Sequence, residues 1–234
     1  MAAKPHRLCT SRAEPESISA SWQRIAPDLA CQQLRIWTFP FRAATHPELL
    51  PGTLGVAGAT SGLILADPAT AHYFRQTNTF GPFNRVMDGT ATKCAIMAVP
   101  ISFYAASLLR RDSYGQQTAI LAGEALVNAE LVVKAGKLMT RRRGPGTIPA
   151  NGDFHDTWFK TSDGSFPSGH TAGAFSVATV FATRYRNHKW VPYVANGAAG
   201  LIGLSTVTSS GHFPSEVFLG AAIGYASSRF AVLR

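Results

Sequence analysis

Apolar and small residues fall into six long blocks along the chain, separated by segments that contain helix breakers such as Asp67-Pro68 and Gly81-Pro82. Each block is longer than an ordinary strand, and strict alternation of apolar and polar residues is scarce. The pattern therefore predicts an all-α protein, a helical bundle of about six core helices. The blocks cover residues 49–66, 94–109, 118–138, 171–185, 191–208 and 217–233.

The first part of the chain differs from these blocks. Residues 1–45 are polar, mixed in charge and interrupted by four prolines, which predicts a loosely structured N-terminal arm with one short helix. Residues 46–234 then form the helical domain. The first 41 residues contain no unbroken apolar stretch, so we do not expect a secretory signal peptide.

The hydropathy of the blocks leaves a soluble and a membrane form equally open. A spanning helix needs about 20 mostly apolar residues, and several blocks approach that length. However, residues 118–138 contain Glu124, Glu130, Lys134 and Lys137, and the mean hydropathy of the whole chain is close to zero. Small residues suit close helix packing in either solvent.

Charge narrows the choice of partners. The formal net charge is +9, which favours phosphate esters or anionic lipid surfaces. Only 15% of the residues are charged, so nucleic acid is the weaker expectation. Cys9, Cys31 and Cys94 lack the spacing of a metal or redox motif, and we expect isolated thiols and no metal site. Nothing in the sequence indicates the oligomeric state.

A loop that turns into a helix precedes the fourth block. Ser168 is a suitable N-cap, Gly169 permits close backbone approach, and His170 falls in the first helical turn. The first N–H groups of such a helix can bind an oxyanion, and His170 could pass a proton to a leaving group. A capped helix start without a catalytic role is the alternative interpretation.

A second histidine occupies a similar position before the last block. His212 is followed by Pro214, which suits the first helical position, and by Glu216 in the first turn. A carboxylate this close in sequence can hold the imidazole by its Nδ1–H and prepare it as a nucleophile. Two such histidines on one chain favour a shared functional site over a chance arrangement.

A basic cluster ends the third block. It contains Lys137 and the consecutive residues Arg141, Arg142 and Arg143, followed by Gly144-Pro145. These cations could complement the negative end of a helix, or they could hold a phosphate group. The sequence alone leaves both roles open.

These segments resemble the three motifs of the type 2 phosphatidic acid phosphatases, which share a fold with class A acid phosphatases and vanadium haloperoxidases. The second motif, Pro-Ser-Gly-His, matches residues 167–170. The first, Lys with Arg-Pro after six residues, keeps Lys137 but has Gly144 at the arginine. In the third, Ser205 and His212 match, Thr206 replaces the arginine and Glu216 the aspartate.

The resemblance implies a phosphatase that uses a phosphohistidine intermediate and needs no metal or other cofactor. His212 would attack phosphorus, His170 would protonate the leaving alkoxide, and Glu216 would orient His212. Lys137, Ser168 and the Gly169 N–H would hold the phosphoryl oxygens. It also implies a phosphate ester substrate, such as a lipid phosphate, and a place in the cell envelope, in the membrane or the periplasm.

Both family arginines are absent in register, and a second register that pairs Lys134 with Arg141 loses the proline instead. We expect either Arg142 or Arg143 to reach the pocket as a substitute, because Gly144 could adopt positive φ. Loss of one phosphate donor lowers the rate about a hundred- to a thousandfold. The competing functions are a non-catalytic protein of this fold that binds phosphate or lipid head groups, and a vanadate-dependent peroxidase, which the missing arginines disfavour.

Overall fold

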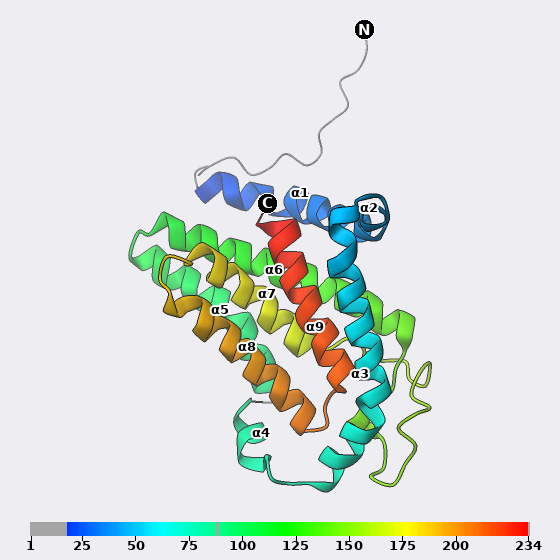
Figure 1. Ribbon diagram of the computed structural model, residues 1–234. Helices are drawn as coiled ribbons and strands as arrows, with labels where there is room; N and C mark the ends of the chain where they lie inside the picture. The colour runs from blue at the N-terminus through cyan, green and yellow to red at the C-terminus, as the bar shows by residue number, and fades with distance from the viewer. Residues whose placement is uncertain (1–17, 88, 234) are drawn as a thin grey trace.

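A computed structural model describes residues 18–87 and 89–233, and these residues form helices and loops without a strand (Figure 1). The all-α prediction is therefore confirmed, and the six blocks correspond to α3 and α5 through α9. Short helical turns are η1 (Pro47–Leu49), η2 (Pro145–Thr147) and η3 (Ser227–Val232). The α-helices are α1 (Ile18–Trp37), α2 (Phe39–Thr45), α3 (Leu50–Gln76), α4 (Gly81–Met87), α5 (Thr90–Leu109), α6 (Ser113–Thr140), α7 (Gly169–Arg184), α8 (Trp190–Thr208) and α9 (Pro214–Ala226).

Helix α7 is the centre of the bundle and packs against α5, α6, α8 and α9. Its buried face consists of small and β-branched residues, so the neighbouring helices approach it closely. The main core cluster joins Val177 and Val180 of α7 to Leu121 and Ala125 of α6 and to Ala199 of α8. This arrangement fixes the start of α7, which carries His170, relative to the ends of three other helices.

Two glycines let α9 cross α7 at backbone distance. A Cβ atom added at Gly220 would lie 2.6 Å from the carbonyl oxygen of Ser168, and one at Gly224 would collide with the carbonyl oxygen of Ala172. In addition, the Ser168 N–H donates to the Glu216 carbonyl at 3.0 Å. The first turns of α7 and α9 are therefore held side by side.

Helix α3 is longer than its block predicted. The Asp67-Pro68 pair does not end it, and the helix continues to Gln76. Proline removes one helical hydrogen bond and usually bends or ends a helix. Here tertiary contacts favour continuation, because the Asp67 carboxylate is fully buried and accepts from Ser215 and Arg142.

The described part of the N-terminal arm is more ordered than the sequence indicated. Helix α1 is 20 residues long and lies across the end of the bundle that also holds the C-terminus (Figure 1). Gln32 donates to Glu124 at 2.9 Å, and Gln33 donates to Asn128 at 2.6 Å. Because polar groups inside α6 require partners, they dock α1.

The cysteines and the long apolar helices bear on two further expectations. Cys31 is disulfide-bonded, which corrects the prediction of three isolated thiols, whereas Cys94 is a free, exposed thiol. Two segments, Pro47–Gln76 and Gly81–Leu109, are long and apolar enough to cross a membrane by length and composition. Many large apolar side chains on α3, α5 and α8 are exposed, among them Leu65, Ile101 and Tyr193.

Candidate active site

The two motif histidines lie at the same end of the bundle. His170 is in the first turn of α7 and His212 immediately precedes α9, and their ring centroids are 6.4 Å apart. The structure thus brings together two residues that are 42 positions apart in sequence. The α7–α9 seam accounts for this, because each histidine is within four residues of the Ser168–Glu216 backbone bond.

His212 is held by a carboxylate and a hydroxyl. Its Nδ1 lies 2.6 Å from Glu216 Oε2 and 3.1 Å from Ser165 Oγ, which itself donates to Glu216 Oε2 at 2.5 Å. Because a carboxylate only accepts, Nδ1 carries the proton of neutral His212 and Nε2 keeps its lone pair. The turn after α8 fixes the backbone, since the His212 N–H donates to the Thr206 carbonyl at 2.9 Å.

His170 is oriented by the start of α5. Its Nε2 lies 3.3 Å from the carbonyl oxygen of Gly89, and since a carbonyl only accepts, Nε2 is protonated in this contact. Gly89 has φ of 91° and ψ of −169°, a conformation that is open essentially to glycine alone. A segment outside the three motifs therefore contributes to the position of His170.

The start of α7 is capped as predicted. Ser168 precedes the helix, its side chain accepts from the Thr171 N–H, and its Oγ lies 3.1 Å from Thr171 Oγ1. Ser168 is fully buried, so its hydroxyl supports the helix start. Gly169 was expected to permit close backbone approach, but a Cβ there would make only ordinary contacts. The close approach is made by Gly220, which the motifs do not include.

Lys137 lies near the end of α6 and is half-buried. Burial lowers its pKa from the ordinary lysine value, although the nearby carboxylates of Glu130 and Glu216 raise it in part. Lys93, at the start of α5, is close enough to lower this pKa as well. Lys93 thus lies near Lys137, which gives this end of the bundle a second cation that the motifs did not indicate.

Arg142 lies behind Glu216. Its side chain is 2% exposed, with Nη2 2.8 Å from Asp67 Oδ2 and Nη1 3.6 Å from Glu216 Oε1. Nη1 also donates to Ser215 Oγ at 2.9 Å. The guanidinium is sandwiched by aromatic rings, 4.1 Å from the centroid of Phe213 and 4.6 Å from that of Trp158. Its donors are therefore directed to protein groups, which favours a positioning role over phosphate binding.

The remaining clamp positions do not place an arginine in the pocket. Arg143 turns to the surface loop, where it donates to Thr147. Gly144 has an extended conformation with φ of −75°, and the left-handed residue is Arg141. A Cβ at Gly144 would lie 3.1 Å from Ser165 Oγ. The Ser165 side chain thus lies where a family arginine would leave the backbone.

Four residues of this site escaped the sequence analysis, because none belongs to the three motifs. Asp67, Gly89, Lys93 and Ser165 each reach the site through tertiary contacts. A charged residue directly after an uncharged apolar block was the available signal for Asp67. A glycine between two helical blocks was a weaker signal for Gly89. Within the described residues, no group of three or more His, Cys, Asp or Glu side chains could hold a metal ion.

The all-α bundle and the paired histidines are the features of the phosphatase class that the motifs resemble. Comparison with protein families agrees with them, since residues 118–233, about half of the chain, match the family model described as PAP2 superfamily. This chain therefore carries a PAP2 superfamily domain. The domain contains both histidines, Glu216 and Lys137, whereas Asp67, Gly89 and Lys93 precede it.

One curated relative is the lipid A 1-phosphatase of Porphyromonas gingivalis, which is 33% identical over 118 residues. The match covers 49% of this chain and 23% of the relative. The chain thus aligns with about a quarter of the length of that protein. No solved structure is significantly similar to the chain.

Proposed function

We propose that this protein is a phosphatase that hydrolyses a lipid phosphate or another organic phosphomonoester through a phosphohistidine formed on His212. The observation that carries the proposal is the 2.6 Å contact between His212 Nδ1 and Glu216 Oε2, with the ring of His170 facing the same space at 6.4 Å. This arrangement supplies an oriented nucleophile and a proton donor beside each other.

In the first step, Nε2 of His212 attacks phosphorus, the bond to the leaving oxygen breaks, and His170 gives that oxygen a proton. Glu216 accepts the Nδ1–H of His212 and so stabilises the positive charge that develops on the imidazole. In the second step, His170 takes a proton from water, the water oxygen bonds to phosphorus, and the N–P bond breaks. Inorganic phosphate leaves, and both histidines return to their starting states.

Positive charge for the phosphoryl oxygens comes from Lys137 and Lys93, together with the first N–H groups of α7. Those N–H groups have no carbonyl partner within the helix, and the N-terminal end of the helix dipole favours an anion. Lysine provides a point charge rather than the two-pronged contact of arginine. We therefore expect turnover that is weaker than that of a site with both family arginines.

The role of Arg142 in this proposal is to position Glu216. The Asp67–Arg142 ion pair is fixed by two further contacts of Asp67, one to the Ser215 N–H and one to Ser215 Oγ. Ser215 directly precedes Glu216, so the same network holds the backbone and the carboxylate of the residue that orients His212. This is a contact behind the reacting groups and not with the substrate.

The lipid character of the substrate and an envelope location are supported by two observations. The matched relative is named a lipid A 1-phosphatase, and two segments could cross a membrane by length and composition. The site lies at the start of α5, which is part of the second segment. A substrate phosphate at this level would stand near a membrane surface, with its apolar part along the helices.

The test is turnover of a panel that includes phosphatidic acid and p-nitrophenyl phosphate, with His212→Ala as the inactive variant. His46 offers a matched control, because its Nδ1 also faces a glutamate, Glu48, at 3.3 Å, but both side chains are exposed. His46→Ala should keep full activity. Rapid quenching with labelled substrate should trap a phosphorylated, acid-labile protein that His212→Ala does not form.

Loss of turnover in His212→Ala with wild-type activity in His46→Ala is the expected result. Turnover that persists in His212→Ala would refute the phosphohistidine. If the wild type turns over no phosphate ester, the enzyme proposal fails, and the alternative of a phosphate- or head-group-binding protein replaces it.

A further inference from the structure

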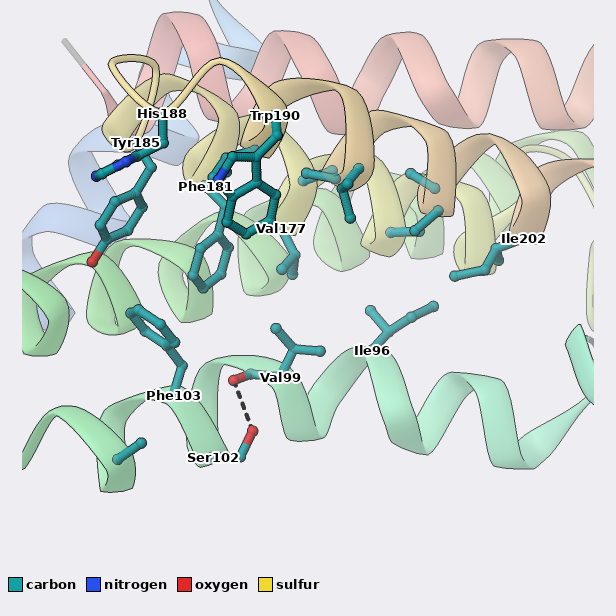
Figure 2. Close-up of a pocket in the computed structure, with 18 residues that line it drawn as sticks. Ile96, Val99, Ser102, Phe103, Val177, Phe181, Tyr185, His188, Trp190 and Ile202 are labelled. Atoms are coloured by element: carbon teal, nitrogen blue, oxygen red, sulfur yellow. Dashed lines mark hydrogen bonds between the residues drawn. The ribbon is translucent and has the colours of Figure 1, made fainter. Parts of the chain in front are cut away.

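A long apolar groove of about 840 Å³ runs between α5 and α8, with α7 as its floor (Figure 2). Val99 and Phe103 of α5 face Val177 and Phe181 of α7 across it. Apart from Ser102 at its edge, polar atoms occur mainly at one end, where Figure 2 shows Tyr185 and His188. A groove of this composition can bind an aliphatic chain without leaving a polar group unpaired.

The opposite end of the groove points toward the active site. Figure 2 shows Ile96 and Ile202 there, and Ala174 is the first residue of α7 that lines the groove. Ala174 follows His170 by four residues on α7, one helical turn or about 6 Å along the axis. Ile96 stands over the same turn, since a Cβ at Gly173 would lie 3.5 Å from its Cγ2. The groove therefore begins about one turn from the paired histidines.

The length of the groove matches the apolar part of a lipid. From Ala174 to Tyr185 along α7, 11 residues at about 1.5 Å each give about 16 Å. Half of a bilayer hydrocarbon core of about 30 Å is about 15 Å. The turn between His170 and Ala174 leaves room for the group that joins a phosphate to its chain. The groove also runs along α5, one of the two candidate spans.

Positive charge beside the active site gives the groove a direction. Lys93 and Lys137 lie at the active-site end, whereas the lining from Val99 to Phe181 is apolar and polar side chains return only beyond it, at Tyr185 and His188. A ligand with an anionic head and one aliphatic tail complements this distribution, and an uncharged lipid gains nothing from the lysines. We propose that the groove binds one acyl chain of the phosphate-bearing substrate and aligns its phosphate with His170 and His212.

The alignment of the phosphate with the two histidines rests on the proposed function, so turnover and binding are measured separately. Ala106 of α5 lines the groove and is exposed, whereas its neighbour Ala105 is exposed and does not line it. Ala106→Trp should fill the groove, and Ala105→Trp is the matched control. Ala198→Trp, on the α8 wall, tests the same space from the other side.

Turnover is compared between decyl phosphate and ethyl phosphate, with the protein in nanodiscs. Each buried methylene contributes about fourfold in affinity, so displacing two of them lowers kcat/KM for decyl phosphate by about tenfold or more. Ethyl phosphate should be unaffected in all three variants. Two results would overturn the inference and leave the phosphatase proposal intact. One is equal kcat/KM for the two esters in the wild type. The other is a loss of kcat/KM for decyl phosphate that is as large in Ala105→Trp as in Ala106→Trp.

Binding is followed with decylphosphonate that carries bromine on its chain, which should quench the fluorescence of Trp190 at the groove. Trp190→Phe shows how much of the quenching comes from this residue. Quenching that is lost in Ala106→Phe, which fills the groove without adding an indole, supports the groove even if no ester is hydrolysed, in which case only the phosphatase proposal fails. Brominated decanol that binds as tightly as the phosphonate would show a bilayer lipid in the groove and refute the link to the active site.

Discussion

The buried ion pair between Asp67 and Arg142 gives the sharpest test of how His212 is positioned. Asp67 is fully buried and Arg142 is 2% exposed, and their closest N–O distance is 2.8 Å. In Asp67→Asn the shape is kept but the charge is lost, which leaves the guanidinium with Glu216 at 3.6 Å as its anionic neighbour. The amide can also accept with only one atom, although Asp67 uses both oxygens.

Removal of one partner from a buried ion pair lowers the free energy of unfolding by about 3–5 kcal/mol. For a chain of this size, that corresponds to a decrease in Tm of about 10 °C. We also expect kcat to fall about tenfold or more, which corresponds to an increase in the activation free energy of at least about 1.4 kcal/mol. The reason is that the unpaired guanidinium moves toward Glu216 and disturbs the contact of Glu216 with His212. KM for a short phosphate ester should stay nearly constant, since neither residue binds substrate.

Asp156→Asn is the control, because it removes the same charge from an exposed ion pair with Lys160. Such a pair contributes at most about 1 kcal/mol. The double variant Asp67→Leu, Arg142→Met should regain much of the stability, as no charge stays unpaired, but not the activity. Circular dichroism melts and steady-state kinetics measure both effects. A recovery of kcat together with Tm, or an unchanged kcat in Asp67→Asn, would refute the positioning role.

Three further variants test the site and the seam beneath it. Lys137→Met should abolish turnover but raise Tm at neutral pH. A lysine of lowered pKa destabilises the folded protein below that pKa, and the protein regains this stability as the pH rises toward the ordinary lysine value. Inorganic phosphate should raise the Tm of the wild type but not that of Lys137→Met. Gly144→Arg should lower kcat/KM about tenfold and should not restore the family clamp, because the new side chain displaces Ser165 and removes a hydrogen bond worth about 1.4 kcal/mol. A rise in kcat/KM would contradict this. Gly220→Ala should destabilise by about 1–3 kcal/mol, because its Cβ meets a backbone carbonyl of α7, whereas Gly197→Ala, with open space around it, should not; denaturant titration compares the two.

Local signals predicted the helices of the bundle and the two helix starts that carry the histidines. The six apolar blocks became α3 and α5 through α9, and Ser168 caps α7 as its residue type indicated. These features depend on side-chain period and on capping, which act over a few residues. The approach of His170 and His212 followed from motif resemblance and is explained by the seam at Gly220.

The direction of long side chains could not be predicted in this way. Arg142 and Arg143 are neighbours of the same type, yet one is buried and the other turns to Thr147. The difference arises from Asp67, which is 75 residues away in sequence. Its position opposite Arg142 depends on the packing of α3 against α9. No local pattern contains that information, and the same holds for the docking of α1.

The buried carboxylate on α3 also bears on how the chain is assembled. Asp67 lies in one of the two segments that could cross a membrane, and a lone aspartate at the centre of such a helix costs about 3 kcal/mol on insertion scales. Its partners, Arg142 and Ser215, are synthesised 75 and 148 residues later. In a membrane, α3 would therefore carry an unpaired aspartate until the C-terminal helices are synthesised and inserted. A chain truncated before α9 should be degraded faster by quality-control proteases.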